Sequence, residues 1–159
     1  MIKRYTLTEA VQKAKLYCRY QERSHFEVTT RLYNLGLFRT DVEKALVQLI
    51  EEGYLNEQRF ANHFVTGKFR SRQWGRIKII HALKQKRIGP AILQEALKGI
   101  DEEEYLGVLQ KLAEEKWAMV NEASYFTKLA KTTHYLLQKG YEADRISKII
   151  AAFPRNANQ

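Results

Sequence analysis

The sequence predicts an all-α protein of three tandem three-helix repeats, stacked into an elongated right-handed or solenoid-like bundle. Three observations support this fold class. Apolar residues recur at spacings of three and four along the chain, as in Val42, Ala45 and Leu49, and no stretch alternates like a β-strand. Helix start and stop signals separate these periodic segments. A similar pattern then returns at intervals of about 50 residues, which is typical of repeat proteins.

Capping residues mark where the helices begin. Thr6, Ser24 and Thr40 each precede a glutamate by three positions. This is the spacing of a capping box, in which hydroxyl and carboxylate groups satisfy free backbone N–H groups of the first turn. Asn56 and Asp101 fit the N-cap position of two later helices.

Glycines mark where several helices end. Gly36, Gly53 and Gly140 each follow an apolar period, at the point where a left-handed residue terminates a helix. Pro90 suits a first helical turn, which needs no N–H at that position. Together these signals predict nine helices, at residues 6–21, 25–35, 41–52, 57–72, 76–87, 90–98, 102–120, 125–138 and 143–152.

The repeats align on three leucines, Leu32, Leu83 and Leu136, which lie 51 and 53 residues apart. The helix-ending position follows four residues after each leucine. A single three-helix unit buries little apolar surface alone, so consecutive units are expected to stack. The predicted boundaries place the first repeat at residues 5–55, the second, basic repeat at 56–100 and the third at 101–155.

Positive charge is concentrated in the middle of the chain. The formal net charge of the 159 residues is +9, yet residues 58–94 contain nine Lys or Arg and no Asp or Glu. The remainder has equal numbers of basic and acidic residues and is therefore neutral. A field of one sign over one segment favours a polyanion or an acidic protein surface as the partner.

The segment GYLNEQRFANHFVTGKFRSRQWGRIKIIHALKQKRI, residues 53–88, resembles the RecX family of regulators of the bacterial recombinase RecA. The resemblance rests on five short motifs: Gly53-Tyr54-Leu55, Arg59-Phe60-Ala61, Arg70-Ser71-Arg72, Trp74-Gly75 and the run from Ile77 to Leu83. The family is also built from three three-helix units. This chain departs from the family pattern at Arg87, where a helix-ending glycine is usual, and at Gln58, where an acidic residue is common.

The resemblance implies a protein that binds the RecA filament and has some affinity for DNA, expected to be dominated by the phosphates of single and double strands. We expect a cytoplasmic monomer, because the apolar stripes of the helices are used within and between the units. It would limit filament assembly or strand exchange without catalysis. An alternative is a duplex-binding protein of the helix-turn-helix type without a RecA role, reading bases with Lys78, His81 and Gln85. A third possibility is a helical adaptor with no nucleic-acid role.

The candidate binding residues come from the basic segment that carries the resemblance. They are Lys68, Arg70, Arg72, Trp74, Arg76, Lys78, Lys84, Lys86 and Arg87. Structural roles stay open for some of them. The cations near residue 87 also suit a helix C-terminus, and Trp74 can either stack on a base or pack between helices.

Within the helix at 76–87, Ile80 and Leu83 are expected to face the core, with Ile77 and Ile79 at its edges.

Other classes of function find little support. The sequence lacks a phosphate-cradling glycine loop, a nucleophile–base pair and a metal-ligand spacing, so neither an enzyme nor a cofactor is predicted. Cys18 is expected to be a buried, inert thiol, and the acidic run at 101–104 to begin a helix. We expect no membrane span and no signal peptide, in keeping with a cytoplasmic location.

Overall fold

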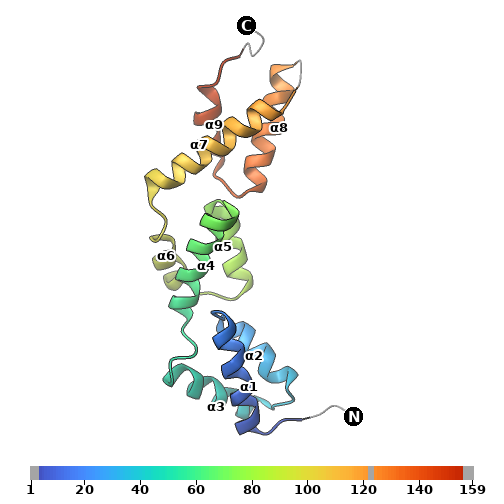
Figure 1. Cartoon of the computed structure of the whole chain (residues 1–159), viewed down its shortest axis with the longest axis vertical. Coiled ribbons are helices and arrows are strands. Elements are labelled where there is room, and N and C mark those ends of the chain that lie inside the picture. Colours follow the sequence, from blue (N-terminus) through green and yellow to red (C-terminus); the bar gives the residue numbers. More distant parts are fainter. Residues whose placement is uncertain (1–3, 122–123, 156–159) are drawn as a thin grey trace. The chain divides into compact units, whose positions relative to one another are not determined.

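A computed structural model describes residues 4–121 and 124–155, and every regular element in these two ranges is an α-helix (Figure 1). In chain order the helices are α1 (Leu7–Tyr20), α2 (His25–Asn34), α3 (Arg39–Glu51), α4 (Glu57–Arg72), α5 (Arg76–Gln85), α6 (Pro90–Leu97), α7 (Glu102–Met119), α8 (Tyr125–Gln138) and α9 (Ala143–Ala151). All-α architecture is thus confirmed, and each helix lies within two residues of its predicted bounds. Within the described residues, no helix combines the length and apolar character that a membrane crossing requires.

Most of the predicted caps are confirmed. Thr6 and Ser24 form complete capping boxes, and the side chains of Asn56 and Asp101 accept backbone N–H bonds at 2.9 Å. The capping box at Thr40 was a wrong prediction. Helix α3 begins two residues earlier, at Arg39, because the carbonyl of Phe38 already accepts from the N–H of Val42 at 3.0 Å.

The three aligned leucines share one helix-ending geometry. The carbonyls of Leu32, Leu83 and Leu136 each accept from the N–H five residues later, at 3.3, 3.1 and 3.2 Å. The residue before that donor has a positive φ in each case: 91° at Gly36, 61° at Arg87 and 101° at Gly140. The sequence alignment therefore matches a repeated backbone structure.

Arg87 takes the left-handed conformation in place of a glycine, which costs about 1 kcal/mol. Its guanidinium group lies over the ring of Phe26, 4.4 Å from the centroid. This cation–π contact contributes about 0.5–1 kcal/mol and offsets part of the backbone cost. Gln73 also has a positive φ, 56°, which the sequence pattern did not reveal.

The chain divides into two compact units, which we describe separately. The first unit comprises residues 1–64 and 83–96, and the second comprises residues 65–82 and 97–159. The repeat boundaries and the stacking expected from the sequence remain predictions.

The core of the first unit lies among α1, α2 and α3. Each helix buries one apolar stripe, and the fully buried side chains include Ala14, Val28, Leu32, Ala45 and Leu49. Residues 83–96 are linked to the rest of this unit by polar contacts. Gln58 donates to the carbonyl of Ile92 at 3.1 Å, and the ammonium of Lys86 lies 3.6 Å from the carboxylate of Glu27.

The core of the second unit is rich in aromatic side chains. Tyr105 on α7 is fully buried, and its ring lies 5.8 Å from that of Phe69 on α4. On another side, its ring lies 5.1 Å from that of Tyr141, in the turn between α8 and α9. Tyr105 therefore connects three separate segments of this unit.

The expected buried face of α5 was partly wrong. Ile79 and Leu83 are fully buried, whereas Ile80 is half-buried and the side chain of Ile77 is 52% exposed. Residues 75, 79 and 83 share one helix face, and Gly75 is held against the turn that follows α8. That backbone contact sets the rotation of α5, which periodicity alone could not fix.

A pair of substitutions tests this assignment. We expect Ile79→Ala to lower the free energy of unfolding by about 2–4 kcal/mol, because it leaves a cavity in the core. Ile77→Ala, on the same helix, should change it by less than about 0.5 kcal/mol. Urea denaturation of both variants measures the difference, and equal effects would contradict the assigned rotation of α5.

Candidate nucleic-acid interface

Two backbone turns dock against each other in the second unit. The first follows α4 at residues 73–75, and the second follows α8 at residues 139–141. The N–H of Gly75 donates to the carbonyl of Lys139 at 2.7 Å, and the N–H of Ile77 donates to the carbonyl of Gly140 at 2.9 Å. The hydroxyl of Tyr141 donates to the carbonyl of Gln73 at 2.8 Å. These bonds use orphan backbone groups at helix ends and fix the start of α5 on the end of α8.

The contact requires glycine on both sides. A Cβ atom at Gly75 would lie only 2.3 Å from the carbonyl carbon of Gly140. A Cβ at Gly140 would lie 2.4 Å from the Cβ of Lys78, and Gly140 also has a φ of 101°. Because most of these neighbours are main-chain or Cβ atoms, they cannot move aside by changing a rotamer.

A cationic group surrounds Trp74 at this junction. The ammonium of Lys78 lies 4.6 Å from the centroid of the half-buried indole, and that of Lys68 lies 5.1 Å from it. Lys139 donates to the carbonyl of Arg72 at 2.9 Å. We call Trp74, Lys68, Lys78 and Lys139 the Trp74 cluster.

Lys139 was not predicted from the sequence, because it lies far beyond the basic segment at 58–94. Burial lowers the pKa of its ammonium, and the positive charge of Lys78 lowers it further. Two cations close enough to repel each other form a local excess of positive charge, which an anion would relieve. The sequence signal that could have found Lys139 is its place beside Gly140, one of the three aligned helix-ending positions.

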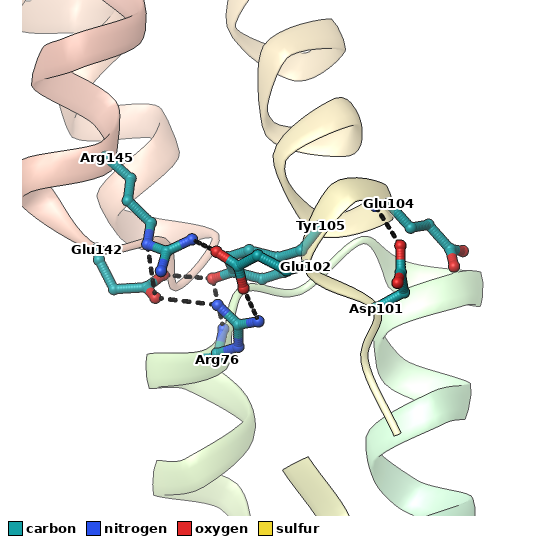
Figure 2. Close-up of polar contacts among 7 residues, drawn as sticks. All are labelled: Arg76, Asp101, Glu102, Glu104, Tyr105, Glu142 and Arg145. Atoms are coloured by element: carbon teal, nitrogen blue, oxygen red, sulfur yellow. Dashed lines mark hydrogen bonds and ion pairs between the residues drawn. The ribbon is translucent and has the colours of Figure 1, made fainter. Parts of the chain in front are cut away.

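Arg76 lies beside the cluster but is engaged in an internal ion-pair network (Figure 2). Its guanidinium contacts the carboxylates of Glu102 at 2.6 Å and Glu142 at 3.5 Å, and its side chain is only 18% exposed. Arg145 pairs with the same two glutamates. We call Arg76, Glu102, Tyr105, Glu142 and Arg145 the ion-pair cluster.

Tyr105 supplies the buried centre of the ion-pair cluster (Figure 2). Its hydroxyl accepts from the N–H of Arg76 at 3.0 Å and donates to the carboxylate of Glu142. The Arg76 guanidinium also lies over the ring, 3.9 Å from its centroid. Burial, and secondarily the bond to Glu142, raise the pKa of Tyr105, so it remains a neutral donor.

The other predicted site residues differ in their surroundings. Arg70 is exposed, with its guanidinium 3.9 Å from the carboxylate of Glu104, and the side chain of Arg72 is exposed. In the first unit, Lys84 is exposed, whereas Lys86 contacts Glu27 and Arg87 contacts Phe26. The structure therefore brings Lys68, Trp74 and Lys78 together and directs Arg76 towards internal partners.

Among the described residues, no group of three His, Cys, Asp or Glu side chains is placed to hold a metal ion. Cys18 is half-buried, and burial raises the pKa of its thiol, which favours the unreactive protonated form.

Comparison with known proteins adds a second line of evidence. The family model described as the second three-helix domain of RecX matches residues 56–97, and the model of the third three-helix domain matches residues 102–150. Together the two matches cover more than half of the chain. The chain belongs to the RecX family. The suspected family is therefore confirmed, and the segment that carried the resemblance lies largely within the first match.

Several RecX relatives are similar over most of this chain. A protein named regulatory protein RecX from Lactobacillus johnsonii is 33% identical over 74% of this chain, and one from Clostridium perfringens is 30% identical over 82%. The chain spans only 44% and 61% of the length of these two relatives. The crystal structure of RecX from Lactobacillus salivarius superposes with a TM-score of 0.82 at 26% identity, covering 91% of this chain and 94% of that one.

The docking of the two turns makes a clear prediction for glycine substitutions. Gly75→Ala should lower the free energy of unfolding by about 1–3 kcal/mol, because its methyl group overlaps the backbone of the facing turn. Gly67→Ala is the matched control, since nothing lies within 4 Å of a Cβ there and alanine favours a helix by about 0.5–1 kcal/mol. The midpoints of thermal denaturation should therefore move in opposite directions, and two equal shifts would contradict the close contact.

The ion-pair cluster predicts acid sensitivity. Hydrogen bonds from Arg145 and then Arg76 lower the pKa of Glu102 in the folded state. The unfolded chain then binds the proton first, so stability should fall as the pH drops from about 4.3 towards that lowered value. Glu102→Gln should flatten this part of the profile of unfolding free energy against pH.

Glu103→Gln serves as the control for this experiment, because Glu103 is exposed on the same turn and lies outside the ion-pair cluster. An equal flattening by both variants would show that the cluster does not cause the acid sensitivity.

Proposed function

We propose that this chain regulates RecA by binding the RecA–DNA filament and limiting its assembly or its strand exchange. The observation that carries the proposal is membership of the RecX family, through matches to two three-helix domains at residues 56–97 and 102–150. The relatives are named as regulatory proteins. We further propose that the chain acts as a monomer in the cytoplasm and does not catalyse a reaction.

We assign the nucleic-acid contact mainly to the Trp74 cluster with Arg70, Arg72 and Lys84. Trp74 offers part of an aromatic surface between two ammonium groups, which suits one base and its neighbouring phosphates. Lys86, Arg87 and Arg76 belong to the same basic segment, but each also has an internal contact. We therefore expect these three to contribute less to DNA binding and more to folding.

The mechanism we propose is steric and electrostatic. Lysine and arginine side chains that meet phosphates release counterions, so binding should weaken steeply with salt. With about four to six phosphate contacts, the log–log slope of affinity against salt would be roughly −3 to −5. A protein held on the filament by such contacts would compete with the second DNA strand or block addition of RecA subunits.

The alternative function is a sequence-reading duplex binder. Its candidate reading residues on α5 are His81 and Gln85, which are exposed, and Lys78, which is half-buried beside Trp74. A protein of that kind would prefer one duplex sequence over others by a large factor. The proposed regulator would bind random sequences with similar affinity and would act on RecA.

A fourfold variant tests the proposal. We expect replacement of Lys68, Arg72, Lys78 and Lys84 by alanine to weaken binding to RecA–DNA filaments at least tenfold and to abolish inhibition of strand exchange at wild-type concentrations. The thermal midpoint should fall only modestly. Arg72 and Lys84 are exposed and contribute about 0–1 kcal/mol each to folding. Lys68 and Lys78 are half-buried, and each loses a cation–π contact with Trp74 worth about 0.5–1 kcal/mol.

The matched control replaces Arg39, Lys44, Lys111 and Lys148, which are exposed and also amount to one arginine and three lysines. Filament binding of this control should stay within about twofold of wild type. Equal losses in the two variants would mean that only net charge matters. If the first variant binds filaments and inhibits strand exchange as wild type does, the basic segment is only a solvated surface and has no binding role.

A further inference from the structure

A second basic surface lies on α7 and α8 of the second unit. An open groove there is lined by Lys116, Ala130, Lys131, His134, Tyr135 and Gln138. Lysine, histidine, tyrosine and glutamine side chains can all donate hydrogen bonds, and none of these six lining residues is a carboxylate. We call these six residues the α8 groove. Its chemistry suits an anionic ligand that offers several acceptor oxygens.

A neighbouring groove between α7 and α9 provides a contrast. Its lining mixes the acids Glu102 and Asp144 with the bases Arg145 and Lys148, beside Leu106 and Ile149. Carboxylates there would repel a phosphate, so this second groove is a poor site for the same ligand. The six described residues that line the α8 groove thus differ in charge from those of the mixed groove, although both grooves belong to the same unit.

The sequence of α8 shows the same bias. From Tyr125 to Tyr141 the chain contains three lysines and one histidine but no aspartate or glutamate. Helix α7, by contrast, mixes acids and bases, as with Lys111 and Glu115, which lie 4.0 Å apart. A helix that excludes acids over its full length presents a field of one sign to a partner.

The last residue of the α8 groove, Gln138, directly precedes Lys139 of the Trp74 cluster in the chain. Lys131, Tyr135 and Gln138 share one face of the helix at spacings of four and three, and Lys139 follows at its end. Lys131 and Lys139 are separated by about 12 Å along the helix axis. That distance corresponds to roughly three or four nucleotides at about 3.4 Å each.

Tyr135 adds a feature that a purely electrostatic patch would lack. The ammonium of Lys116 lies 4.9 Å from the centroid of its half-buried ring. Trp74 is flanked by lysines in the same manner. The α8 groove and the Trp74 cluster thus both combine an aromatic ring with ammonium groups, the combination that suits a nucleic-acid strand better than an acidic protein surface.

We propose that the α8 groove binds the backbone phosphates of a nucleic-acid strand that continues from the Trp74 cluster. This inference rests on the proposed function, because it extends the same contact from the turn at Trp74 onto the third three-helix domain. Lys131 is the main phosphate ligand of the extension, with His134 and Gln138 as additional donors.

The test measures binding of a fluorescein-labelled random 20-nucleotide single strand to the full chain by anisotropy. Lys131→Glu should weaken binding at least threefold at low salt, and Lys131→Gln should reduce the log–log salt slope by about 0.7, the value for one phosphate contact. Lys148→Glu, which makes the same charge change in the mixed groove, is the control and should bind as wild type does. Circular dichroism would verify that all variants remain folded.

The outcomes separate the two proposals. If Lys131→Glu binds like Lys148→Glu while alanine substitution of Lys68 and Lys78 weakens binding, the groove proposal fails and the proposed function stands. If the wild-type chain binds neither DNA nor filaments, both fail. If Lys131→Glu impairs binding to RecA without DNA but leaves DNA binding intact, the groove serves an acidic protein surface and the nucleic-acid assignment is overturned.

Discussion

The backbone contact between Gly75 and Gly140 is the constraint on which the second unit depends. It pairs orphan N–H and carbonyl groups at the end of α8 with those at the start of α5. It also fixes the rotation of α5, so that Ile79 faces the core and Ile77 does not. The same contact places Lys139 beside Lys78, although about 60 residues separate them in sequence. One pair of glycines therefore determines both the buried face and the charged surface.

The ion-pair cluster explains why positive charge remains available next to this contact. Glu102 and Glu142 face the start of α5, and both are engaged by Arg76 and Arg145. The described ion pairs of these two acids are with the arginines and not with Lys78 or Lys139. Under the proposed function, Arg76 would support nucleic-acid binding indirectly, by pairing with carboxylates that would otherwise reduce the positive field of the Trp74 cluster.

Local signals predicted most of the fold. Apolar periodicity and caps placed the helices within two residues, since these features act over a single turn. The aligned helix ends at Gly36, Arg87 and Gly140 were also visible, including the unusual arginine. Long-range contacts were not visible. The rotation of α5, the partners of Arg76 and the role of Lys139 all depend on contacts between segments distant in sequence, which no local pattern encodes.

Backbone contacts and exposed side chains have different roles in this protein, and this difference determines which residues can change without loss of the fold. The contacts that position the Trp74 cluster use main-chain atoms, two glycines and a buried tyrosine, so they depend on few residue identities. Exposed lysines and arginines contribute little to folding, and their number and placement can change without loss of the fold. A TM-score of 0.82 to the Lactobacillus salivarius structure at only 26% identity is consistent with this view. Affinity for a polyanion, which depends on the count of such cations, can therefore vary among proteins that share this fold.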